Sequence, residues 1–96
     1  MAIYLLVPTG LNAARLTEAV QAHTSEPDRY QIVNDAGWFV VYKGTSVELS
    51  NLLEITGQAA GQPSVVGSVL IIPVFSYYGR GNTDMWEWLK TRLEAG

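Results

Sequence analysis

The alternation of apolar and polar positions along the chain predicts seven regular segments in the order β-α-β-β-α-β-α. Strands are expected at 3–7, 29–34, 38–43 and 68–75, where β-branched and aromatic residues gather between turn residues. Helices are expected at 11–22, 46–56 and 84–94, where apolar residues recur at helical spacing. This order predicts an α+β fold: a ferredoxin-like βαββαβ antiparallel sheet with an extra C-terminal helix.

Several boundaries carry their own chemical signals. Thr9 is expected to cap the first helix, and TSVE at 45–48 is a capping box that opens the second. Residues 35–37 supply a tight reversal, so the two middle strands form a hairpin. Pro73 has no N–H for a ladder, so the strand 68–75 is expected at a sheet edge or with a bulge.

The predicted strands are apolar on both faces, whereas the first two helices can cover only one. We expect a second copy of the chain to cover the other face, which predicts a homodimer. Burying several large side chains at roughly 1.5–3 kcal/mol each would offset the entropy of association. The last helix is the competing cover, because Trp86 and Leu89 can fold back across that face. Trp38 is expected in the core.

Composition narrows the function classes. The length of 96 residues suits a single domain over 1–96. Of these residues, 48% are apolar and only 16% are charged. This is more apolar material than one small core requires, which again favours a partner. The absence of cysteine excludes disulfides, thiolate metal sites and a cysteine nucleophile. A net charge of −3 with six scattered basic residues disfavours a phosphate track. The N-terminal apolar run is too short for a membrane span or signal segment, which predicts a cytoplasmic protein.

Candidate binding residues fall in two loops. Thr9 and Asn12 surround the start of the first predicted helix, where backbone N–H groups can receive an anion, and Arg15 adds a charge one turn later. A capped helix with a surface arginine also explains them and is the favoured interpretation.

The second loop is SYYGRGN at 76–82. Tyr77 and Tyr78 can present flat amphipathic faces, and Arg80 can stack or form paired hydrogen bonds with a nucleotide, base or peptide. An equally favoured alternative is that one tyrosine packs inward and the glycines only form the turn.

Catalytic chemistry has little support. His23 is the only histidine, the acids are dispersed, and no P-loop, dinucleotide fingerprint or zinc spacing occurs. We therefore expect no catalytic residue, no metal and no cofactor. A metal-independent ribonuclease would have to draw its acid–base pair from Tyr78, Arg80 and His23.

Three stretches carry a family resemblance: the M-x-IYLL start, the block GWFVVYKGTSVELSNLL, and VLIIPV followed by a glycine loop and WEWLKTRL. They resemble the SinR-like proteins, a small group related to the CRISPR spacer-acquisition subunit with the ferredoxin-like fold. The resemblance implies a compact homodimer and a setting in bacterial or phage defence. In relatives with nuclease activity an aspartate ends the first strand; LLVPTG has Pro8 and Thr9 there, so metal-dependent cleavage is not carried over.

The sequence thus favours a non-catalytic dimeric binding or interaction module. Its expected surface accepts a small anionic ligand such as a nucleotide, and is formed by Thr9, Asn12, Arg15, Tyr77, Tyr78 and Arg80. Two alternatives stay open: a metal-independent ribonuclease of toxin type acting on RNA, and a purely structural subunit whose hydrophobic face joins a different protein.

Overall fold

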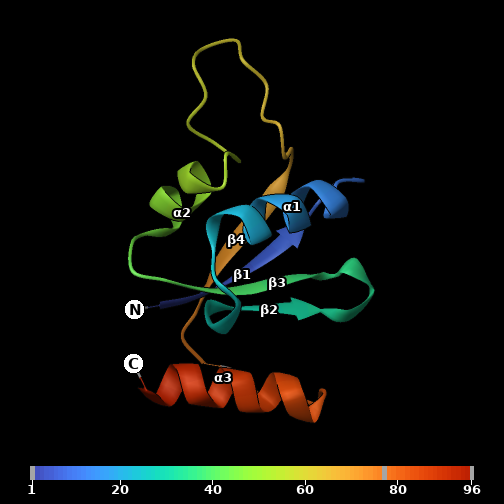
Figure 1. The fold of residues 1–96 in the computed structure, drawn as a ribbon, viewed down its shortest axis with the longest axis vertical. Coiled ribbons are helices and arrows are strands. Elements are labelled where there is room, and N and C mark those ends of the chain that lie inside the picture. Colours follow the sequence, from blue (N-terminus) through green and yellow to red (C-terminus); the bar gives the residue numbers. More distant parts are fainter. Residues whose placement is uncertain (1, 77, 96) are drawn as a thin grey trace.

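The chain folds into the seven predicted segments in the predicted order. The computed structural model describes residues 2–76 and 78–95. The elements are β1 (Ala2–Pro8), α1 (Ala13–His23), β2 (Arg29–Ile32), β3 (Gly37–Tyr42), α2 (Ser46–Leu52), β4 (Val69–Val74) and α3 (Thr83–Ala95), with short 3₁₀ turns at Glu26–Asp28 and Val33–Asp35 (Figure 1).

The four strands form one sheet in the order β2-β3-β1-β4, and every neighbouring pair is antiparallel. The central strand β1 pairs Leu6 with Trp38 on one side and with Ile71 on the other. This confirms an α+β fold with a four-stranded antiparallel sheet and three helices. β4 lies at an edge, which confirms the position that Pro73 predicted.

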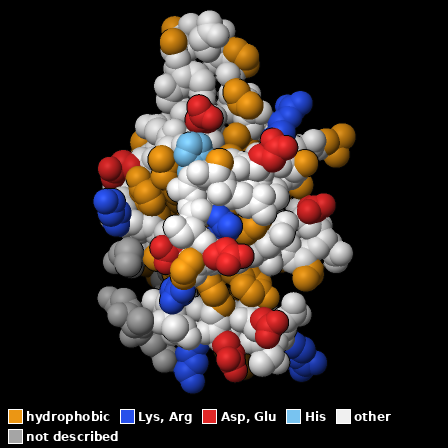
Figure 2. Space-filling model, in the orientation of Figure 1, with side chains coloured by type: hydrophobic (Ala, Val, Ile, Leu, Met, Phe, Trp, Pro, Cys, Tyr) orange, Lys and Arg blue, Asp and Glu red, His pale blue; other side chains and the backbone are white. Residues whose placement is uncertain are grey.

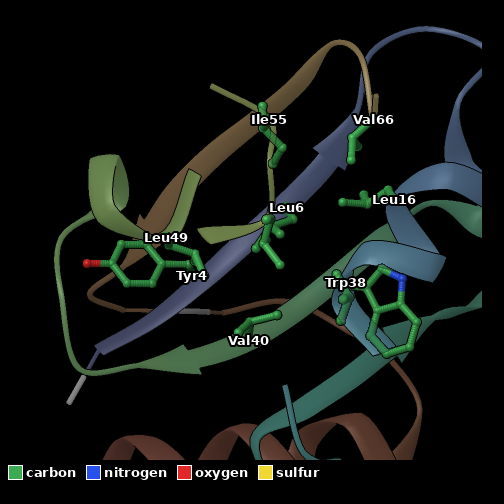
Figure 3. Packing of buried hydrophobic residues seen from close by; sticks show 10 residues of the cluster. Tyr4, Leu6, Leu16, Trp38, Val40, Leu49, Ile55 and Val66 are labelled. Atoms are coloured by element: carbon green, nitrogen blue, oxygen red, sulfur yellow. The ribbon is translucent and has the colours of Figure 1, made fainter. Parts of the chain in front are cut away.

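One face of the sheet packs against α1 and α2. Tyr4, Leu6 and Val40 point from the strands toward Leu16 of α1 and Leu49 of α2 (Figure 3). Trp38 lies in the same cluster, as predicted, and its Nε1 donates to Thr17 Oγ1 at 3.2 Å. The Tyr4 hydroxyl reaches the Gly44 carbonyl at 2.7 Å. The polar atoms of Trp38 and Tyr4 are therefore hydrogen-bonded within this core.

The opposite face is covered by α3, which lies across the sheet from α1 and α2 (Figure 1). Leu89 is buried against Ile3 and Phe39, with Trp86 and Trp88 partly buried beside them. Apolar side chains fill the seam between α3 and the rest of the molecule (Figure 2). The expectation that the chain's own helices shield only one face is therefore wrong: the competing cover, α3, occupies the second face. The predicted uncovered face therefore no longer supports a homodimer.

A polar contact fixes the far end of α3. The Arg92 guanidinium donates through Nε and Nη2 to the Pro27 carbonyl, and it also lies over the Trp88 ring at 5.8 Å. Trp88 in turn stacks on Phe39 at 6.2 Å between ring centroids. The last turns of α3 are thus tied to the 3₁₀ turn that precedes β2.

Three predicted boundaries are corrected. α1 begins at Ala13 after Asn12, so Thr9 does not cap it. The strand predicted over 29–34 ends at Ile32, because Asn34 adopts the left-handed conformation that asparagine tolerates (φ 61°). The helix predicted over 46–56 ends at Leu52, and the chain reverses shortly after it through a left-handed Glu54 (φ 62°).

The capping box is confirmed and gives a first prediction. Thr45 Oγ1 accepts from the Glu48 N–H at 3.1 Å, while a Glu48 carboxylate oxygen accepts from the Thr45 N–H at 3.0 Å. Thr45→Ala removes the cap and is expected to lower the unfolding free energy by about 1 kcal/mol in urea denaturation at pH 7. Thr91→Ala, on an exposed position of α3, is the control and should stay within about 0.5 kcal/mol. Equal urea midpoints for the two variants would contradict the role of the cap.

The same box predicts a pH dependence. The Thr45 backbone N–H, followed by the Thr45 side chain, lowers the pKa of the Glu48 carboxyl. Because this pKa is lower in the folded than in the unfolded chain, the ionised Glu48 carboxylate stabilises the fold above the ordinary carboxyl range. This stabilisation is lost as the pH falls through the folded-state pKa. Glu48→Gln, which has no titrating carboxyl, should therefore lose less stability than the wild type on acidification, as measured by urea denaturation at neutral and acidic pH.

Candidate functional site

The two predicted binding loops do not form one surface. Thr9 and Asn12 join β1 to α1, on the side of the sheet that α1 and α2 cover. Tyr78 and Arg80 lie in the segment that leads into α3, which covers the opposite side (Figure 1). The sheet thus separates the two groups. Tyr77, the remaining member, lies outside the described residues.

Asn12 is a structural residue in this arrangement. Its Nδ2 donates to the carbonyls of Val66 and Ser68, both at 2.9 Å, and its Oδ1 accepts from the Gly10 N–H at 3.1 Å. The side chain is buried and makes no cap bond to α1. Both amide hydrogens are therefore committed to holding the β1–α1 loop against the segment before β4. Local sequence patterns could not predict this role, because the acceptors lie 54 and 56 residues away.

The other predicted binding residues are exposed. Thr9 is exposed in the loop between β1 and α1, and Arg15 is exposed in the first turn of α1. Tyr78 and Arg80 are exposed in the segment before α3. No acidic residue occupies the first turn of α1, which leaves the Thr9–Arg15 region compatible with an anion. Ligand binding by these four residues stays a prediction.

Among the described residues, the predicted catalytic groups do not lie together, and no group of metal ligands is formed. His23 ends α1, while Tyr78 and Arg80 belong to the α3 side of the sheet, so the three pieces of a ribonuclease are not brought together. Among the side chains of residues 2–76 and 78–92, no three His, Asp or Glu groups are gathered to hold a metal ion. Along residues 2–76 and 78–95, no helix has the length and apolar character to cross a membrane.

A hollow of about 590 Å³ lies at the C-terminal end of α1 and is bordered by Arg29 and Trp38. The Arg29 guanidinium donates to the carbonyls of Gln21 and Thr24. Arg29 therefore serves the last carbonyls of α1, a usual role for arginine at a helix C-terminus.

The feature that residue-by-residue reasoning missed is a groove along the open edge of β4. Two shallow hollows, of about 470 and 560 Å³, share Thr56 and Val69 and run between α2 and β4. Their lining is hydroxyl-bearing or apolar, with one amide and no charged side chain: Thr9, Ser46, Val47, Ser50, Asn51, Ile55, Thr56, Ser64, Gly67, Ser68, Val69, Leu70 and Ile71. The signal for it was in the sequence, since no charged residue occurs between Glu54 and Arg80.

Comparison with known proteins adds no relative. No family model matches the chain, and no curated protein or solved structure matches it. The resemblance to SinR-like proteins remains a prediction that depends on the stretches quoted above.

Proposed function

We propose that this chain is a non-catalytic interaction module that works as a homodimer and has a ferredoxin-like fold. The strand order taken from the open edge is β4-β1-β3-β2, with one helix between β1 and β2 and another between β3 and β4. Two split βαβ units in this order support the ferredoxin-like topology.

The observation that carries the proposal is the exposed, uncharged stretch around β4. Leu70 is 53% exposed, Ile72 39% and Phe75 85%. Proteins that stay monomeric usually protect an edge strand with charges, and residues 55–79 contain none. A surface of this kind supports association with another protein chain over catalysis on a soluble substrate.

Solution mass tests the proposal. Sedimentation velocity over roughly 5–500 µM should show a concentration-dependent monomer–dimer equilibrium, a range suited to an interface below the standard size. A monomer at every concentration would overturn the homodimer. A stable complex with a different protein, formed by a chain that stays monomeric alone, would favour the structural-subunit alternative.

A nucleotide or other small anionic ligand remains part of the proposal, at the exposed residues Thr9 and Arg15 or at Tyr78 and Arg80. Thermal shifts with nucleoside mono-, di- and triphosphates should rise with ligand concentration. Loss of the shift in Arg15→Ala or in Arg80→Ala should identify the loop that binds.

RNA incubated with the protein, with and without a chelator, should stay intact. Cleavage that disappears in Arg80→Ala would show a ribonuclease instead.

A further inference from the structure

The outward-facing backbone groups of β4 can be assigned from one hydrogen bond. Thr9 N–H donates to the Ser68 carbonyl at 3.0 Å, which makes Thr9 and Ser68 a hydrogen-bonded pair at the start of the β1–β4 ladder. Backbone groups in an antiparallel ladder alternate from residue to residue. Leu70, Ile72 and Val74 therefore direct their N–H and C=O groups to β1, and Val69, Ile71 and Pro73 direct theirs to the open edge.

The two prolines of these strands agree with this assignment. Pro8 lies opposite Val69 and Pro73 lies opposite Tyr4, so both occupy the non-hydrogen-bonded pairs of the β1–β4 ladder. A proline there costs the ladder nothing, because it has no N–H to donate. The open edge consequently offers two donors, from Val69 and Ile71, and three carbonyl acceptors.

We propose that β4 pairs antiparallel with β4 of a second copy, around a two-fold axis at Leu70, so that the two sheets join into one of eight strands. The inference rests on the proposed homodimer and names its interface. An extended partner must be uncharged, because the edge and its groove offer no charge to pair with. The chain itself supplies such a strand, and an edge strand paired around a two-fold axis is self-complementary.

The position of Pro73 selects the register. With the axis at Leu70, Val69 of each copy lies opposite Ile71 of the other, and the two pairs form four N–H···O bonds. With the axis at Ile71, each Val69 lies opposite a Pro73, and its carbonyl finds no donor. Both registers form four bonds, but of the two only the Leu70 register leaves Pro73 beyond the central bonds, where its carbonyl can reach water.

Side chains fit this arrangement on both faces. Leu70 and Ile72 lie on the α3 face, at positions that remain exposed beside α3. Leu70 would meet Leu70 of the other copy across the axis, and Ile72 would lie opposite Ser68. Val69 and Ile71 point to the other face, where the groove beside α2 leaves space for the second strand. The contact is smaller than the roughly 800 Å² per partner of a standard interface, which fits a concentration-dependent dimer.

The absence of cysteine allows a direct test by disulfide trapping. Leu70→Cys introduces the only thiol, and in this register two such residues face each other at about 4.5 Å between Cα atoms, within disulfide reach. Diamide oxidation should convert most of the variant into a covalent dimer on a non-reducing gel. Ile72→Cys is the matched control on the same strand and face. Its thiol is displaced from its mate by four residues, about 13 Å, and should stay unlinked.

A charge variant provides the second measurement. Leu70→Lys places two ammonium groups opposite each other and should raise the dimer dissociation constant at least tenfold, whereas Leu11→Lys, at an exposed loop position, should leave it unchanged. If Leu70→Cys sediments as a dimer when reduced but does not cross-link, the β4 pairing about Leu70 is overturned and the homodimer survives. Cross-linking of Ile72→Cys instead would overturn the Leu70 register, because it places the two-fold axis at Ile72. A wild-type monomer at every concentration overturns both.

Discussion

Replacing Leu89 with alanine is expected to lower the unfolding free energy by roughly 2–5 kcal/mol, as large-to-small substitutions at fully buried positions do. Leu89 is 2% exposed and packs against Ile3 and Phe39 on the second face of the sheet. Its truncation removes transfer free energy and leaves a cavity between α3 and the sheet. Urea denaturation followed by tryptophan fluorescence measures the loss, because Trp88 of α3 lies in the same cluster.

Lys90→Ala is the control, since Lys90 is the next residue of α3 and is exposed. It should change the unfolding free energy by no more than about 0.5 kcal/mol. If Leu89→Ala were equally mild, α3 would not be docked on the sheet. The second face would then be uncovered, and the argument for a dimer formed through that face would return.

The elements themselves were predictable because their signals are local. The capping box of Thr45 and Glu48, the apolar run of β3 and the helical spacing in α3 each lie within one short window of sequence. The failures at Asn34 and Glu54 are also local in cause. Both residues adopt left-handed conformations that end an element early, and propensity alone does not show where an L-residue will accept that strain.

The cover of the second face could not be decided from the pattern. Trp86 and Leu89 marked α3 as amphipathic, so either this helix or a second copy could satisfy the sheet. The choice depends on the direction in which the chain continues from β4 to α3, and the two glycines in this connection do not determine that direction. Covering the face from within the same chain avoids the entropy of association, which a second copy would have to offset.

The candidate site was predictable only in its exposed parts. Arg15 and Arg80 are on the surface, as loop composition suggested, but their placement on opposite sides of the sheet follows from topology. The groove along β4 had two sequence signals, Pro73 and the uncharged residues 55–79. Pro73 alone left an edge strand and a bulge as alternatives, and the strand order shows that β4 lies at an edge.

Asn12→Ala is the second substitution with a large expected effect, a loss of about 1–3 kcal/mol of unfolding free energy. The change leaves the carbonyls of Val66 and Ser68 without the Nδ2 donor, and Gly10 N–H without its acceptor. Because Val66 is 3% exposed, water does not readily replace the lost bond there. Chemical denaturation at pH 7 measures the loss.

Asn12→Asp sharpens the test because it is isosteric and keeps the oxygen that accepts from Gly10, but it removes both donors. It places a carboxylate against two carbonyl oxygens and should be at least as destabilising as alanine. Arg15→Ala, on the same segment but exposed, should stay within about 0.5 kcal/mol. A ligand-binding role for Asn12 without a structural one would produce the reverse: full stability in both Asn12 variants, with nucleotide binding lost. The hydrogen bonds to Val66 and Ser68 predict that stability falls first, because the loop that carries Thr9 is held in place by them.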